Sequence, residues 1–228
     1  MTKFTQTYPT DLKYTEWQLI ETFFPTYHMG HPRKWELSQI VNAILYVVRT
    51  GCHWRILPKD LPPWPTVYGY FRRWNKAGLW ERINEALVKK VPVKNWCKPE
   101  PSAGILDRQS VKTSEGGEQR GVDVQWFETI KRSLHNRWCR LKLIWADAAY
   151  ACIVDKVANN FGWTLDIVRR SDKAKGFELL PHRWIVERTF GWLGRYRRLS
   201  RDFERTVSSS ESVVYIASIR RLLKLATN

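Results

Sequence analysis

A proline-rich stretch at residues 91–103 divides the chain into two parts with different hydrophobic patterns. Its three prolines oppose continuous helix, because proline lacks an amide hydrogen and its ring clashes with the preceding turn. Upstream, apolar residues recur at three- and four-residue steps, which is typical of amphipathic helices. Downstream, short apolar runs alternate with helical segments, which is typical of α/β domains. The sequence therefore predicts a helical domain at residues 1–92, a linker at 93–103 and an α/β domain at 104–228.

The apolar spacing also predicts the individual elements, four helices upstream and strands mixed with helices downstream. The expected upstream helices cover residues 17–24, 40–48, 66–76 and 79–88. The expected downstream strands are 105–106, 143–146 and 165–168, and the expected downstream helices are 126–134, 153–161, 181–193 and 212–226.

The amino-acid composition indicates which class of binding partner to expect. The 228 residues are 43% hydrophobic, enough for a buried core without disulfides, and the net charge is +16. Such an excess of cations on a folded protein favours a polyanion, first nucleic acid and second an acidic membrane surface. The longest apolar run is too short to span a bilayer, the first residues carry no export signal, and the four cysteines are scattered. A cytoplasmic protein with reduced thiols is expected.

The helix expected at residues 66–76 is the candidate DNA reader. With Val67, Tyr70, Phe71 and Trp74 buried, the side chains of Tyr68, Arg72, Arg73 and Lys76 would remain partly free for phosphates or base edges. Such a helix following a Pro-rich turn is compatible with a helix-turn-helix variant. The alternative is a helical bundle whose basic face is simply solvated.

Three acids form the candidate catalytic site. Asp107 and Asp147 follow apolar strand-like runs, and Glu187 lies in the expected helix 181–193. A carboxylate at such a position is costly unless it is paired or bound to a cation. If the two strands are neighbours, the acids can converge on divalent cations, and a pair of such ions can activate a nucleophile for phosphodiester chemistry. The alternatives are helix caps, ion-pair partners and surface charges.

Several segments together resemble the bacterial insertion-sequence transposases of the DDE class. The similar segments are NAILYVVRTGCHWRILP (42–58), PPWPTVY (62–68), LDRQSVKT (106–113), IWADAAY (144–150), RWIVERTFGWL (183–193) and GRYRRLS (194–200). The resemblance implies an RNase H-like catalytic domain behind a helical DNA-binding domain. It also implies that Asp107, Asp147 and Glu187 are the metal-binding acids, with Arg183 as the basic partner of Glu187.

The resemblance further implies an enzyme that binds the inverted terminal repeats of a mobile element as a possible homodimer. With Mg²⁺ or Mn²⁺ it would cut the element free and join the 3′ ends to target DNA. The basic run at residues 195–205, with Arg195, Arg197 and Arg198, would hold phosphates beside the metals. The alternative is a solvated basic helix end.

Two departures from the family pattern stand out. Arg108 replaces the small residue that usually follows the first acid, and its role is open. Between Asp107 and Asp147, the Gly-rich stretch 113–124 lacks the alternation of the expected β-hairpin. We therefore expect a shortened RNase H-like domain with an internal deletion. The alternatives are a weak or inactive DNA-binding remnant or repressor of such an element, and a nuclease-like domain acting on RNA or repair intermediates.

Overall fold

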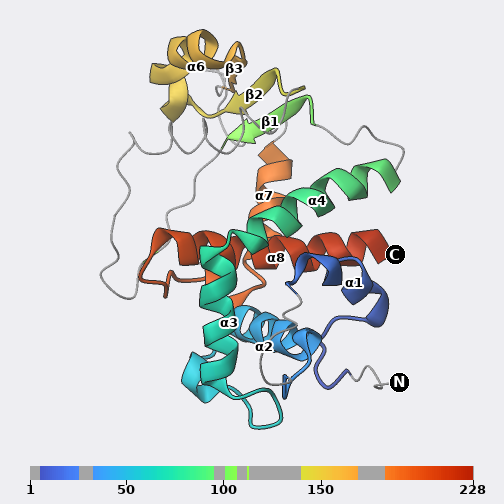
Figure 1. The fold of residues 1–228 in the computed structure, drawn as a ribbon. Coiled ribbons are helices and arrows are strands. Elements are labelled where there is room, and N and C mark those ends of the chain that lie inside the picture. The colour runs from blue at the N-terminus through green and yellow to red at the C-terminus, as the bar shows by residue number, and fades with distance from the viewer. Residues whose placement is uncertain are drawn as a thin grey trace. The chain divides into compact units, whose positions relative to one another are not determined.

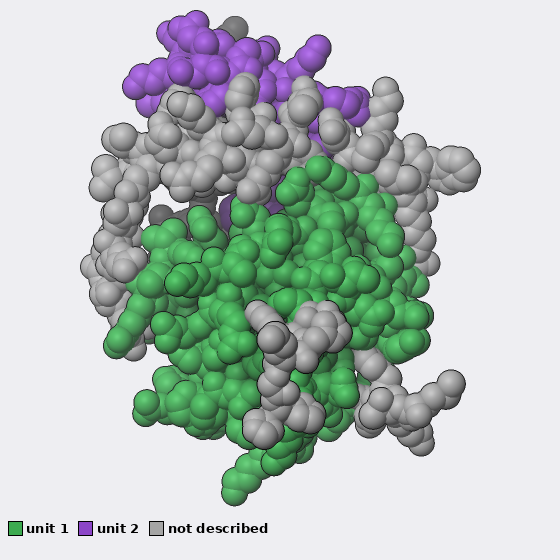
Figure 2. Space-filling view, in the orientation of Figure 1, with its two compact units in different colours: residues 1–97, 111–118, 193–228 green, residues 98–110, 119–192 purple. Residues whose placement is uncertain are grey.

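The computed structural model describes residues 6–25, 33–94, 101–106, 112, 140–168 and 183–227. The chain forms two compact units (Figures 1 and 2). The helical unit comprises residues 1–97, 111–118 and 193–228, and the sheet unit comprises residues 98–110 and 119–192.

The helical unit contains five α-helices and three short 3₁₀ turns among the described residues. The α-helices are α1 (Tyr14–Gln18), α2 (Leu37–Thr50), α3 (Trp64–Lys76), α4 (Leu79–Lys94) and α8 (Val207–Thr227). The 3₁₀ turns are η1 (Glu21–Phe23), η2 (Trp54–Ile56) and η5 (Arg197–Leu199).

Local sequence sets the ends of α2 and α3. At the start of α2, the backbone N–H of Glu36 donates to the Gln39 side chain over 3.0 Å, which satisfies a donor that would otherwise lack a partner. The helix ends at Gly51, whose φ of 71° lies in the left-handed region that glycine adopts without steric cost. Helix α3 begins after Pro63, and Pro65 lies in its first turn, where no amide hydrogen is needed.

The core of the helical unit is rich in aromatic rings. Trp74 contacts Phe24 and Trp80 edge to face, with ring centroids 4.8 and 5.6 Å apart. Helix α8 packs most extensively on α4 and also contacts α1, α2 and α3. The apolar residues of α8 that join this core are Val213, Ile216, Ala217, Ile219 and Leu223.

The position of α8 differs from the expected domain division. The sequence pattern groups the last helix with all of residues 104–228 in the downstream domain, whereas residues 193–228 belong to the helical unit. The physical reason is the apolar stripe of α8, which is buried in the same core as α1 to α4. The N-terminal helices and the C-terminal helix therefore form one folding unit.

Among its described residues, the sheet unit contains three parallel strands in the order β1–β2–β3. They are β1 (Ala103–Leu106), β2 (Leu143–Ala146) and β3 (Thr164–Ile167). Between β2 and β3 the chain forms the 3₁₀ segment η4 (Ala148–Ile153) and helix α6 (Val154–Phe161), a connection that parallel strands require. Helix α7 (Arg183–Leu193) follows β3.

The mixed α/β class is confirmed, and most expected elements are present with shifted ends. Strand β2 has the predicted bounds, β3 begins one residue earlier than predicted, and α8 begins at Val207 instead of Ser212. Helix α4 continues past Pro92 to Lys94, because a proline near the end of a helix removes a single backbone hydrogen bond. The stretch 113–124 and the helix predicted at 126–134 lie outside the described residues.

Candidate functional site

Asp147 stands at the end of β2 and caps the segment that follows. Its Oδ1 accepts a hydrogen bond from the Ala149 backbone N–H over 3.0 Å, and the side chain is exposed. Behind it, Tyr150 and Ile153 are buried in the core of the sheet unit. One carboxylate oxygen is thus oriented by the backbone, and within the described ranges Oδ2 accepts no hydrogen bond.

The register of β1 and β2 shows where the strand that precedes the first acid ends. Leu106 and Ala146 are partners in the parallel pair, so the two strands end side by side. Asp107, the next residue after Leu106, lies outside the described residues, as does Arg108. Among the residues described, no group of three or more His, Cys, Asp or Glu side chains could hold a metal ion. The expected triad therefore lies only partly within the described chain.

Helix α7 lies against β1 and β2 across an apolar pocket of ≈ 400 Å³. The strands contribute Ala103, Gly104, Ile105 and Trp145, and the helix contributes Ile185, Val186, Thr189 and Phe190. Glu187 is exposed, and helical geometry turns it to a different face from the residues that line this pocket. The backbone of Arg183 begins α7, and its side chain lies outside the described part of the chain.

An arginine that sequence reasoning missed lies one residue after Glu187. The Arg188 guanidinium carbon lies 4.5 Å from the Trp184 ring centroid and 4.8 Å from that of Trp192. The three residues follow each other at four-residue steps, so they share one face of α7. This spacing was visible in the sequence and could have predicted the cation–π contacts.

The candidate reading helix α3 presents its predicted cations to solvent. Arg72, Arg73 and Lys76 are exposed, while the opposite face buries Val67 and Phe71 at 0% and 1% exposure. The guanidinium of Arg73 stacks over the ring of Tyr70 at 5.0 Å. Tyr70, predicted in the buried stripe, is half-buried beside it.

The basic run after α7 divides into exposed and buried members. Arg195 and Arg197 are exposed, as expected for phosphate contacts. Arg198 differs from the expectation, because its side chain is only 6% exposed and forms an ion pair of 2.7 Å with Glu204. Its guanidinium also lies over the rings of Trp54 and Phe203. Arg198 therefore stabilises the fold and is not accessible to a phosphate.

The same run docks on the end of α2 within the helical unit. Arg49 donates to the Arg195 carbonyl and stacks over the Tyr196 ring at 5.3 Å. Gly51 approaches Arg197 so closely that an added Cβ would lie 2.9 Å from the Arg197 Cβ. The run belongs to the helical unit, and its expected position beside the metal-binding acids stays a prediction.

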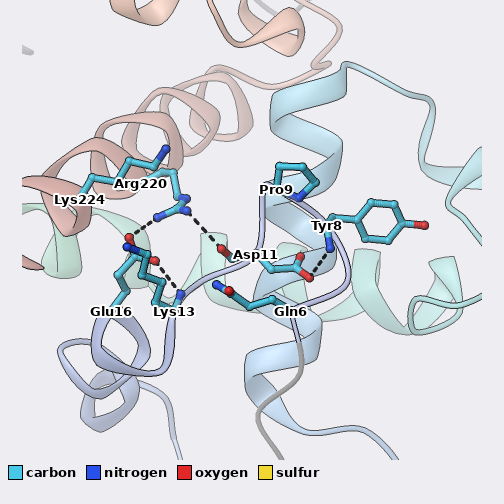
Figure 3. A pocket seen from close by; sticks show the side chains of 8 residues that line it. All are labelled: Gln6, Tyr8, Pro9, Asp11, Lys13, Glu16, Arg220 and Lys224. Carbon is cyan, nitrogen blue, oxygen red and sulfur yellow. Dashed lines mark hydrogen bonds and ion pairs between the residues drawn. The ribbon is translucent and has the colours of Figure 1, made fainter.

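A second pocket, of ≈ 360 Å³, lies where α1 meets α8 (Figure 3). Its buried centre is Arg220, which donates to Glu16 over 2.6 Å and to the Asp11 carbonyl over 3.1 Å. Burial, followed by the neighbouring charge of Arg220, lowers the pKa of Lys224 at its rim. Because Glu16 already neutralises Arg220, the geometry indicates a contact that holds α8 to α1 and not a binding site for an anion.

Comparison with known proteins identifies the family. Residues 12–84 match a family model described as a transposase of the IS4/5 family, and residues 120–220 match the transposase DDE domain. The chain belongs to the DDE-class insertion-sequence transposases. By family it is an enzyme of DNA transposition, a class that acts on DNA and generally uses divalent metal ions.

One curated protein is similar to this transposase. The chain is 28% identical over 112 residues to the uncharacterized 16.2 kDa protein of insertion element IS402 from Burkholderia cepacia. The similarity covers 46% of this chain and 75% of that protein. No solved structure matches the chain. None of the helices described here is both long and apolar enough to cross a membrane.

Proposed function

We propose that this chain binds the terminal inverted repeats of a mobile element and performs metal-dependent strand cleavage and transfer. The observation that carries the proposal is the pairing of β1 with β2. Leu106 and Ala146 are partners in a parallel pair. Each is followed in the sequence by an acid, Asp107 after Leu106 and Asp147 after Ala146. Carboxyl ends of neighbouring parallel strands are where ligands of open α/β sheets bind.

The chemistry of the donor set fits a hard divalent cation. Asp107, Asp147 and Glu187 offer carboxylate oxygens, which Mg²⁺ and Mn²⁺ prefer over nitrogen or sulfur. The hydrogen bond from Ala149 orients Asp147 with one oxygen left toward solvent. Exposure of Asp147 and Glu187 is compatible with access by a DNA strand.

The chain's own residues have distinct tasks in this proposal. A bound pair of divalent ions supplies an activated water or 3′-hydroxyl and stabilises the leaving oxyanion. Asp107, Asp147 and Glu187 hold the ions, and Arg183 acts as the partner of Glu187. Arg195, which precedes η5, and Arg197, its first residue, bind phosphates. Arg72, Arg73 and Lys76 on α3 grip the repeat through a helix-turn-helix variant.

The proposal includes the finer architecture and assembly. The parallel order β1–β2–β3 of the described strands supports an RNase H-like sheet. We further propose a homodimer on DNA in the bacterial nucleoid, with terminal repeats and target DNA as its substrates and no membrane partner. The net charge of +16 supports a duplex as the main partner.

A second function is a DNA-binding remnant or repressor without catalysis. One observation favours it: the match to the DDE domain begins at residue 120, downstream of Asp107. The first acid therefore lies outside the part of the chain that matches the catalytic domain. An internal deletion before Asp147 would leave the DNA-binding helical unit intact.

Strand cleavage separates the two functions. The assay incubates the full chain with a labelled duplex carrying the inverted repeats that flank its coding sequence, with Mg²⁺, with Mn²⁺ or with EDTA. A transposase nicks the repeat end only with metal, loses cleavage in Asp147→Ala and keeps it in the control Asp155→Ala, an exposed acid of α6. Duplex binding that weakens steeply with salt, without cleavage in either metal, identifies the remnant.

A further inference from the structure

The middle of α3 carries a glycine that the protein's own structure does not require. Gly69 lies inside the helix, where glycine is less favourable than alanine. It is not among the glycines with a left-handed backbone, which are Gly51, Gly78 and Gly162. Among the described residues, a Cβ added at Gly69 would meet no atom within 4 Å apart from its two chain neighbours and its own helix backbone. Neither conformation nor packing explains this residue.

Gly69 occupies the centre of the exposed face of α3. Arg72, Arg73 and Lys76 follow it by three, four and seven residues, so all four lie on one side of the helix. Pro65, one turn earlier, is exposed on the same side. The opposite side is fixed in the core through Val67, Phe71 and Trp74. The outer face of α3 thus carries small residues in its N-terminal half and cations in its C-terminal half.

Among the described residues, the cations of this face have no acidic partner. Trp64–Lys76 contains no Asp or Glu. Within the part of the chain that the structure describes, Arg72, Arg73 and Lys76 form no ion pair. Three unneutralised cations at helical spacing attract a polyanion. An acidic membrane is the poorer fit, because a membrane-surface helix needs a broad apolar face beside its cations, and Gly69 and Pro65 offer little apolar area here.

Helix α3 is also held firmly enough to present a rigid surface. The Asn75 side chain accepts hydrogen bonds from Ser208 and Ser212 of α8, over 2.7 and 2.8 Å, and donates to Ser209 over 3.2 Å. Because α8 is the longest helix of the same core, these bonds fix the rotation of α3 about its axis. A recognition surface built on a fixed helix needs no rearrangement to bind.

We propose that Gly69 is the point of closest approach between α3 and duplex DNA. The bare backbone at Gly69 and the short Pro65 side chain admit a DNA strand to within contact of the helix. Arg72, Arg73 and Lys76 then reach phosphates or base edges around that contact. This inference rests on the proposed DNA-binding function and adds the residue that determines how deeply the helix enters.

The test measures stability and affinity in the same variants of the full chain. Gly69→Ala should raise the thermal midpoint, because alanine favours helix, and should weaken binding to the repeat duplex. Gly69→Leu should weaken binding by about tenfold or more, the loss expected when one specific contact is removed. A folding defect would lower both quantities, whereas the proposal predicts opposite changes for Gly69→Ala.

Matched control variants separate a lost DNA contact from a general change of charge or side-chain size. Arg72→Ala should weaken binding and reduce the salt slope by about one, whereas Arg82→Ala, an exposed arginine of α4, should change neither. Val214→Leu, which enlarges an exposed side chain of α8, should leave affinity unchanged. Unchanged affinity in folded Gly69→Leu overturns the inference.

The outcomes also separate this inference from the proposed function. If the wild-type chain binds no duplex at low salt, both fail. If it binds and folded Gly69→Leu binds equally well, only the inference fails. If Gly69→Leu loses affinity while the wild-type chain shows no metal-dependent cleavage, the inference is supported and the catalytic proposal is overturned.

Discussion

Arg220 on the last helix donates a 2.6 Å hydrogen bond to Glu16 on the first, and both side chains are buried. The two residues are 204 positions apart in the sequence. Arg220 also donates to the Asp11 carbonyl, so one guanidinium joins α8 to the segment that enters α1 (Figure 3). A buried polar contact therefore connects the first and the last helix of the helical unit.

Removing Arg220 should be strongly destabilising. Arg220→Met keeps much of the side-chain volume but leaves Glu16 as an unpaired buried charge, which costs about 3–5 kcal/mol of unfolding free energy. Urea denaturation measures this loss. The control is Lys89→Met, which breaks the partly exposed pair of Lys89 with Glu85 at 3.0 Å and should cost about 0.3–0.5 kcal/mol. Equal losses in the two variants would contradict a special role for the buried pair.

The packing of α8 should be needed for the N-terminal helices. Leu223 is fully buried in their core, so Leu223→Ala should lower the unfolding free energy by about 2–5 kcal/mol. Val214, on the same helix, is 41% exposed, and Val214→Ala should change stability by about 0.5 kcal/mol or less. If Leu223→Ala were as mild as Val214→Ala, α8 would not be part of the cooperative unit.

The contact between Gly51 and the basic run gives a third prediction. Gly51 and Gly78 both have positive φ, 71° and 63°, but only Gly51 has a neighbour that an added Cβ would strike. Gly78→Ala should cost about 1–2 kcal/mol from backbone conformation alone. Gly51→Ala should cost about 1–3 kcal/mol more, because the Arg197 backbone must move. Thermal unfolding of the pair measures the difference, and equal midpoints would refute the close contact.

Gly51→Ala should also report on DNA binding. The displaced segment carries Arg195 and Arg197, the exposed members of the basic run. Under conditions where both variants remain folded, Gly51→Ala should weaken duplex binding, while Gly78→Ala should not. Gel-shift titration at constant salt distinguishes them, and equal affinities would exclude these arginines from the interface.

Sequence periodicity predicted what depends on local pattern. The stripe Val67, Phe71 and Trp74 recurs at helical spacing, and α3 buries these side chains. The apolar run Leu143–Ala146 predicted β2 with the observed bounds. In both segments, burial of a regular apolar pattern determines the structure, so the sequence alone was sufficient.

The remaining features could not be predicted, because they depend on which segments pack together in the folded chain. The spacing of Val213, Ile216 and Leu223 showed that α8 has an apolar face, but it did not reveal that α4 covers that face. Arg198 reads in the sequence as one more cation of a basic run, and only its contacts with Glu204 and Trp54 in the folded chain explain its burial. The register of β1 and β2 likewise depends on strand pairing, which no single segment encodes.

The Tyr8 phenol should make stability depend on pH in the alkaline range. Its hydroxyl donates to both oxygens of Asp60, over 2.9 and 2.8 Å. The hydrogen bond to Asp60, followed by burial and the Asp60 charge, raises the pKa of Tyr8 from 10.0 to about 12. A raised pKa means that the folded state favours the neutral phenol. The stabilisation of the fold by the Tyr8–Asp60 hydrogen bond is therefore complete below pH 10 and is lost as pH rises toward 12.

The measurement is the unfolding free energy of wild type and Tyr8→Phe from about pH 8 to about pH 11, a range that spans the ordinary pKa of a tyrosine. The variant lacks the hydrogen bond, so it should be less stable at the lower end, and the difference should shrink as the unfolded wild-type phenol ionises above its ordinary pKa of 10.0. Asp60→Asn removes the charge that holds the proton and should bring the loss of stability closer to pH 10.0. A difference between wild type and Tyr8→Phe that is constant across this range would show that the Tyr8–Asp60 contact does not raise the pKa.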